Sequence, residues 1–291
     1  MNKSLQTIPV YWINLERDIK RRKRMAYALD TGKWKSKRWE ATDGRNHQEK
    51  LLSFERFWQK PSEFPGGLRS KEADPIRRTT KSELACLCSW QRLIESLQHE
   101  KSPNDWFLLM EDDVGSSLAV PNHWPFNLDE LIKEAGEEAL AIQMAPINGQ
   151  TRRALFQVWI ESGQRQLLAP KAKVRSHGNG AILLNQKALA LLRRRVGCWI
   201  ENFFTNTHIL GHPRQIRPVA DKWLYASLPI EKCWVITFPL FILEAETSSL
   251  HKDHVNSFHL ASRKITLDIW GSNKYYHLIE ADKRWRSIDC S

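Results

Sequence analysis

Short apolar runs, each about the length of a strand, alternate along the chain with segments of helical periodicity. The runs lie at 8–14, 37–44, 106–110, 139–144, 156–161, 178–185 and 232–241. Helical patterns occupy 17–29, 80–97, 128–139, 186–195 and 221–228. The run WFLLM (106–110) is apolar throughout, as in strands that are covered on both faces of a sheet. The alternation predicts an α/β domain with a mixed, mostly parallel sheet.

The length of the chain fits one large domain. With 291 residues, of which 42% are hydrophobic, it can bury a substantial core. We expect this domain to span 1–261, because 262–291 is mixed and charged and predicts a peripheral C-terminal extension. Residues 59–78, rich in Pro, Gly and charge, predict a long loop that could close over a site as a lid.

The charge and cysteine content indicate the kind of partner and the compartment. A formal net charge of +11 favours phosphorylated or polyanionic partners, or an anionic membrane surface. The 13 tryptophans suit stacking on sugars or bases. The N-terminus lacks the apolar run of a signal peptide, and the five cysteines are scattered. We therefore expect a cytoplasmic protein. Peripheral contact with the inner membrane face is a second option that the sequence leaves open.

Three consecutive carboxylates follow the apolar run at 106–110. Strand alternation would place Glu111 and Asp113 on one face and turn Asp112 away. Three carboxylates this close repel one another, and this repulsion is costly in a buried setting unless a positive charge compensates it. The pattern leaves two interpretations open: a site for a hard divalent cation, Mg²⁺ or Mn²⁺, or an acidic turn paired with a nearby arginine.

A very basic segment follows the first predicted strand. Arg17 and Arg21 lie one helical turn apart and are the pair that we expect at a phosphate group. The other basic residues of 17–24 are typical of a solvated helix face.

Several segments together, in the same order, resemble glycosyltransferase family 25, the lipooligosaccharide-biosynthesis and collagen-galactosyltransferase family. They are INLERDIKRRKRM (13–25), ATDG (41–44), ELACLCSW (83–90), LLMEDDV (108–114), GNGAILLNQKALALL (178–192), PVAD (218–221), FPLF (238–241) and SSL (248–250). Two positions depart from the family pattern: Ala85 replaces a glycine and Trp90 replaces a histidine. The tryptophan could stack on a sugar ring or simply pack.

The resemblance implies a GT-A-like fold, that is, a Rossmann-type domain that binds a nucleotide-sugar with a divalent metal on its diphosphate. Glu111 and Asp113 would be the metal ligands, with Mn²⁺ or Mg²⁺ as the cofactor. A UDP-sugar would be the donor, and its pocket would be lined by Asn14, Leu15, Arg17, Arg21, Asp43 and Asp112. Leu15 could equally be core and Asp43 a turn residue. For Glu83, an N-terminal capping role in the helix at 80–97 is the better interpretation.

The resemblance also implies an inverting transfer, in which one base takes the proton of the acceptor hydroxyl. Asp221 is the candidate base; alternatively, it is an N-terminal acid on the helix at 221–228. Glu244 and Glu246 are further candidates, and His251 and His254 could contact metal or phosphate.

Three functions are compatible with the sequence. The first is transfer of a sugar, galactose being the leading candidate, from a UDP-sugar to a glycan or lipooligosaccharide acceptor. The second is a metal-dependent phosphoesterase or nuclease, and the third is a basic nucleic-acid-binding protein. No nucleic-acid-binding motif is found, and no His-Asp cluster lies near residue 111, so the first is favoured.

Overall fold

The computed structural model describes residues 8–45, 81–194, 219–244 and 259–288. Several features named from the sequence lie outside these ranges: the loop at 59–78, the first residue of the helix predicted at 80–97, two of the five cysteines (Cys198 and Cys290), Pro218, Glu246, the segment 248–250, His251 and His254. No described helix has the length and apolar content that crossing a bilayer requires.

Within these ranges, seven strands form one sheet in the order β2-β1-β3-β6-β4-β7-β5. The strands are β1 (Val10–Asn14), β2 (Ser36–Glu40), β3 (Trp106–Glu111), β4 (Ala141–Gln143), β5 (Leu168–Pro170), β6 (Ala181–Asn185) and β7 (Cys233–Ile236). β1 runs parallel to β2 and β3, and β4 runs parallel to β7, whereas β6 and β5 are antiparallel to their neighbours. The predicted single α/β domain with a mixed sheet is therefore confirmed.

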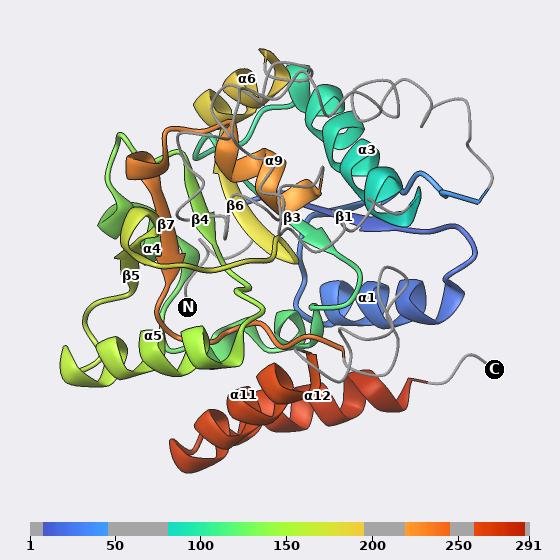
Figure 1. Ribbon diagram of the computed structural model, residues 1–291. Helices are drawn as coiled ribbons and strands as arrows, with labels where there is room; N and C mark the ends of the chain where they lie inside the picture. Colours follow the sequence, from blue (N-terminus) through green and yellow to red (C-terminus); the bar gives the residue numbers. More distant parts are fainter. Residues whose placement is uncertain (1–7, 46–80, 195–218, 245–258, 289–291) are drawn as a thin grey trace, which may run out of the picture.

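Helices cover both faces of the sheet (Figure 1). The described α-helices are α1 (Ile19–Thr31), α3 (Lys81–Ser96), α4 (Leu128–Ala135), α5 (Gly149–Glu161), α6 (Gln186–Arg194), α9 (Ala220–Ala226), α11 (Leu260–Ser272) and α12 (Tyr276–Ser287). In Figure 1, α3, α6 and α9 lie above the sheet, and α1, α5, α11 and α12 lie below it.

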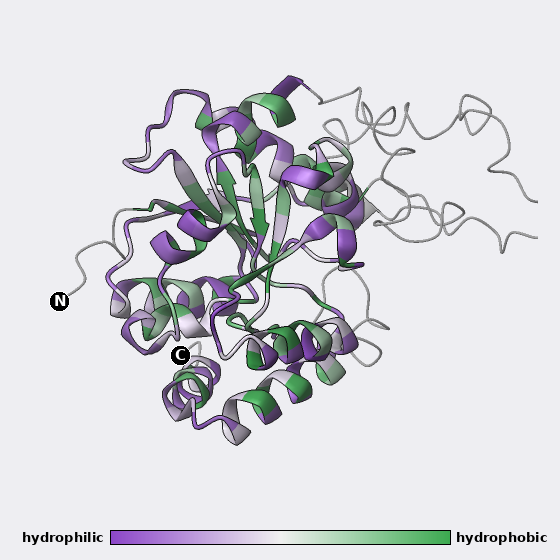
Figure 2. Ribbon diagram, turned by 90° about the vertical axis from the view of Figure 1, so that its left-hand side faces the viewer, coloured by the Kyte–Doolittle hydropathy of each residue, from purple (hydrophilic) through white to green (hydrophobic). Residues whose placement is uncertain are grey.

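Strand alternation divides the core between these two layers. In β3, Leu108 and Met110 pack in the cluster that includes residues of α1, α11 and α12, whereas Phe107 and Leu109 pack with α3, α6 and α9. All four side chains are fully buried. The hydropathy colouring shows the same pattern, with apolar strands between helices that are polar on their outer sides (Figure 2). The apolar run at 106–110 was therefore a reliable signal of a strand covered on both faces.

One predicted strand is wrong. The run at 156–161 is the second half of α5, which begins after Asn148, whose side chain accepts a hydrogen bond from the Thr151 amide at 3.0 Å. Arg152, Leu155 and Trp159 are buried at helical spacing, so the helix period determines this segment. Five other strands are shorter than the predicted runs, since β1 begins at Val10, β2 ends at Glu40, β4 spans only Ala141–Gln143, β6 begins at Ala181 and β7 ends at Ile236.

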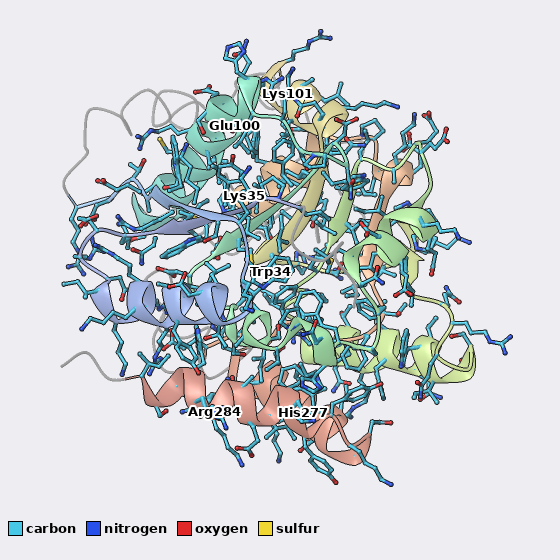
Figure 3. The ribbon with its side chains drawn as sticks, turned by 180° about the vertical axis from the view of Figure 1, so that it is seen from behind. Trp34, Lys35, Glu100, Lys101, His277 and Arg284 are labelled. Carbon is cyan, nitrogen blue, oxygen red and sulfur yellow. The ribbon has the colours of Figure 1, made fainter. Side chains whose placement is uncertain are left out.

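The end of the chain forms two packed helices. Trp270 of α11 and Trp285 of α12 are buried, and α12 contacts both α1 and the short helix η4 (Ser116–Ala119). Figure 3 shows His277 and Arg284 on this layer, at the opposite end of the molecule from Glu100 and Lys101. The division at residue 261 stays a prediction, but the described part of 262–291 contributes aromatic side chains to the main core.

Truncation of Trp285 should therefore destabilise the whole domain. Trp285→Ala removes a fully buried ring that also lies 5.4 Å from the Arg24 guanidinium, and we expect a loss of about 3–5 kcal/mol in the free energy of unfolding. Tyr276→Ala, at an exposed position of the same helix, is the control and should leave the urea midpoint nearly unchanged. Equal midpoints for Trp285→Ala and wild type would show that α12 is not part of the cooperative core.

Candidate functional site

A cavity of about 370 Å³ opens at the edge of the sheet where β1 and β3 end. Its wall includes the end of β1, the turn after β3, and the segments 147–148, 177–180 and 219–222. The nine residues expected as metal ligands, at the donor or as the leading base candidate all line this cavity: Asn14, Leu15, Arg17, Arg21, Asp43, Glu111, Asp112, Asp113 and Asp221. This is the position at which α/β sheets bind ligands, past the carboxyl ends of their parallel strands.

Glu111 is the last residue of β3 and faces the α3 side of the sheet. Its Oε1 accepts a hydrogen bond from Trp90 Nε1 at 3.0 Å and lies 3.6 Å from Cys86 Sγ. Burial and the nearby Asp113 raise the pKa of Glu111 to about 7. Trp90 is fully buried, so it packs and holds this carboxylate rather than presenting its ring to a sugar.

Asp112 and Asp113 both approach α1. The strand ends at Glu111, so the alternation that was expected to pair Glu111 with Asp113 does not extend beyond it. Asp112 accepts hydrogen bonds from Asn14 Nδ2 at 2.6 Å and from Arg21 Nη1 at 3.2 Å, and Asp113 Oδ2 lies 3.8 Å from the same Arg21 nitrogen. Even so, burial raises the pKa of Asp112 to about 7. Arginine pairing therefore compensates part of the acidic charge.

Arg21 belongs to a buried network that reaches the end of the chain. Its Nε lies 2.9 Å from Glu244 Oε2, and Arg24 Nη1 bonds the other oxygen of Glu244 at 2.5 Å. Arg24 also donates to the Arg286 carbonyl at 2.7 Å. Burial opposes the Arg21 charge, but Asp113, Asp112 and Glu244 together raise its pKa. The expected role of Arg21 at a phosphate stays a prediction, and Glu244, which is not on the cavity wall, is held by two arginines.

The remaining residues expected at the nucleotide lie on the cavity wall, where several of them form bonds within the protein. Arg17 forms an ion pair with Asp43, whose Oδ1 also accepts the Arg45 amide at 2.9 Å. Asn14 Oδ1 accepts from Arg22 Nε at 3.2 Å and from Arg38 Nε at 3.0 Å. Asn14 therefore orients Asp112, and Leu15 is half-buried on the cavity wall.

Asp221 and His177 occupy another part of the wall. Asp221 lies in the first turn of α9, and its two oxygens accept the Gly178 amide at 3.0 Å and the Lys222 amide at 2.9 Å. His177 Nδ1 lies 4.0 Å from Asp221 Oδ2. The predicted N-terminal acid of a helix is thus also a cavity residue.

Several residues that line the cavity were not identified as site residues from the sequence. His177 and Asn179 precede β6, which is antiparallel to β3 and therefore begins where β3 ends. The segment SHGNG at 176–180 was a usable signal, since polar and glycine residues directly precede an apolar strand. Cys86 and His259 also line the cavity, as does the buried Glu83, for which a helix-capping role was expected.

The raised pKa values of Glu111 and Asp112 predict an unusual pH dependence of stability without metal. An acid whose folded pKa lies near 7 and whose unfolded pKa lies near 4 binds more protons when folded, so stability falls as pH rises between those values. The loss is up to about 1.4 kcal/mol per pH unit for each carboxyl.

Urea unfolding in EDTA at pH 5, 6, 7 and 8, for wild type and Glu111→Gln, tests this. The amide can still accept the Trp90 hydrogen bond but cannot ionise, so the stability of wild type relative to the variant should decrease with pH. A relative stability that stays constant or increases over this range would contradict the assignment.

Part of the chain matches a known protein family. Residues 7–138 match the model of glycosyltransferase family 25 (LPS biosynthesis protein). The matched segment contains β1, α1, β2, α3, β3 and α4, hence the three carboxylates and the Arg21 side of the cavity, but not His177 or Asp221. No curated protein matches the chain. The family resemblance inferred from the sequence is confirmed over residues 7–138, and the resembling segments after residue 138 stay a prediction.

Proposed function

We propose that this protein, a glycosyltransferase by its family 25 region, transfers galactose from UDP-galactose to a glycan or lipooligosaccharide acceptor, with inversion and with a divalent metal. The observation that carries the proposal is the meeting of three carboxylates, basic side chains and a roomy cavity at the carboxyl edge of the sheet. A nucleotide-sugar needs these features together, because its diphosphate is anionic and its sugar must be sheltered from water.

The carboxylates fit a hard divalent cation. Asp113 Oδ1 is buried and has no hydrogen-bond partner in the part of the chain that the structure describes. The Glu111 carboxylate lies close enough to Asp113 for the repulsion between the two negative charges to raise the pKa of Glu111. Among the described residues, no group of three or more His, Cys, Asp or Glu is arranged around a common centre. Mg²⁺ and Mn²⁺ suit such a site, because one or two carboxylates suffice when phosphate oxygens and water complete the coordination.

Glu111 and Asp113 would hold this ion, with Trp90 keeping the Glu111 carboxylate in place. When bound, the metal would supply positive charge against the diphosphate as it leaves the sugar. The nucleotide would lie along Leu15, Arg17 and Asp43, and the Arg17 side chain, which is 39% exposed, would be able to face it.

The acceptor would enter from the Asp221 side of the cavity. Inversion needs one group there to receive the hydroxyl proton while the oxygen attacks the anomeric carbon. Asp221 and its neighbours supply carboxylate and imidazole groups at this position. The net charge of +11 supports an anionic acceptor, such as a lipid-linked glycan carrying phosphate.

Thermal stabilisation by a panel of nucleotide-sugars, with Mn²⁺ or with EDTA, tests the proposal. UDP and one UDP-sugar should raise the midpoint only with Mn²⁺, because a ligand at 100 times its Kd adds about 2.7 kcal/mol to stability. Product analysis with the stabilising donor should then show glycoside formation. No response to any uridine nucleotide would contradict the proposal, and phosphate release without sugar transfer would favour the phosphoesterase.

A further inference from the structure

The segment that carries His177 is fixed from its backbone. The His177 carbonyl accepts hydrogen bonds from Gln143 Nε2 and from the Ile147 amide, each at 3.0 Å. The same Gln143 nitrogen donates to the Gly178 carbonyl at 2.5 Å. Gly178 has φ of 95°, and a Cβ there would approach Ile147 Cγ2 to 2.4 Å, so this turn requires glycine. The His177 backbone is therefore held at the cavity edge.

A buried lysine ties this segment to the neighbouring elements. Lys171 Nζ donates to Gln143 Oε1 at 3.0 Å and to Ser176 Oγ at 2.7 Å. It also lies 4.3 Å from the ring centroid of Tyr225, on the same helix as Asp221. Because Lys171 is fully buried and contacts both sides, it fixes the His177 segment relative to α9.

The side chains of His177 and Asp221 meet on the cavity wall. His177 is 31% exposed and its Nδ1 lies 4.0 Å from Asp221 Oδ2. The two backbone amides that bond Asp221 hold its carboxylate in one orientation. An imidazole with one nitrogen toward a fixed carboxylate has its other nitrogen available to a substrate.

We propose that His177 is the catalytic base of the transfer and that Asp221 is its positioning residue. This inference rests on the proposed function and changes the role expected of Asp221. The acceptor hydroxyl gives its proton to His177 Nε2 as its oxygen forms the bond to the anomeric carbon. The bond from that carbon to the diphosphate oxygen breaks, and its electron pair leaves with UDP. Asp221 then stabilises the imidazolium until the proton passes to water.

The charges around His177 favour the neutral imidazole that a base requires. Burial lowers its pKa, Asp221 opposes this, and Lys171, Lys222 and Arg175 lower it further. His177 therefore accepts a proton at neutral pH, and activity should fall only at pH values below the ordinary pKa of histidine. Removing the Asp221 charge should move this fall to still lower pH.

Five variants test the assignment, with UDP-galactose as donor and octyl β-lactoside as acceptor. His177→Asn should lower kcat about 10²- to 10⁴-fold and leave the Kd of UDP with Mn²⁺ unchanged. Asp221→Asn should lower kcat less and shift the acidic limb of the pH profile downward. His99→Asn, exposed and outside the cavity, is the control and should match wild type.

His259→Asn addresses the competing imidazole. His259 also lines the cavity, and its Nδ1 has no hydrogen-bond partner in the described ranges. Loss of kcat in His259→Asn with near-normal kcat in His177→Asn would overturn the inference. So would a proportional loss of thermal stability and activity in both His177→Asn and His177→Gln, which would indicate a structural role.

An NMR titration of labelled histidine separates this inference from the proposed function. The His177 signal, assigned by its absence in His177→Asn, should titrate at lower pH in Asp221→Asn than in wild type. An unchanged titration would remove Asp221 as the positioning residue even if the enzyme transfers sugar. Failure of wild type to transfer any sugar would instead remove the proposed function, and the base assignment with it.

Discussion

Replacing both Glu111 and Asp113 with alanine should lower the Mn²⁺-dependent affinity for UDP by at least about 100-fold. Loss of groups that only support metal ligands already costs 10- to 100-fold in many sites, and these two carboxylates are the proposed ligands themselves. Transfer activity should fall at least as far, because the diphosphate would leave without a compensating charge. Isothermal titration calorimetry of UDP at saturating Mn²⁺ measures the first effect.

The same double variant should not lose stability in the absence of metal. Burial and mutual repulsion raise the pKa of Glu111, so at neutral pH its charge opposes folding. Arg21 keeps Asp112 and Glu244 as partners. A thermal midpoint in EDTA that equals or exceeds that of wild type would identify the acids as functional rather than structural. Glu95→Ala, at an exposed position on α3, is the control for both measurements. UDP affinity equal to wild type would contradict the metal site.

Glu244→Ala should have the opposite signature, a large loss of stability. Glu244 is 3% exposed and is the carboxylate between Arg21 and Arg24. Removing one member of a buried ion network leaves charge without its counter-ion and costs about 3–5 kcal/mol. Urea unfolding should show this loss at every Mn²⁺ concentration, because the free protein itself is affected.

The control is a glutamate in an exposed ion pair with a lysine. Glu280→Ala breaks an exposed contact with Lys283 on α12 and should leave the urea midpoint unchanged. Glu244→Gln should lie between alanine and wild type, because the amide oxygen can still accept one guanidinium hydrogen bond. If Glu244→Ala unfolds with the midpoint of wild type, the link from the acidic turn to α12 does not contribute to stability.

The local sequence pattern was sufficient to predict the central strands and the residues on one side of the candidate site. The apolar run at 106–110 and the burial of all five residues of β1 follow from residue type alone, as does the position of the acids at the end of β3. The ordered family segments added the cavity residues of β1 and α1, which the structure brings together.

Pairings across long sequence distances were not predictable in this way. Arg24 meets Glu244 across 220 residues, and nothing in the basic segment distinguishes it from its exposed neighbours. His177 was missed because its place at the site depends on β6 being antiparallel to β3. The segment at 156–161 was mistaken for a strand because a short apolar run contains less than two helical turns.

Calorimetric titration of the wild-type protein with UDP, in Mn²⁺ and again in EDTA at pH 7.5, tests most directly whether the carboxylates after β3 bind a nucleotide diphosphate through a divalent ion. We predict a one-to-one isotherm with Mn²⁺ and no measurable binding with EDTA. The same affinity in both buffers, or no binding in either, would contradict the account.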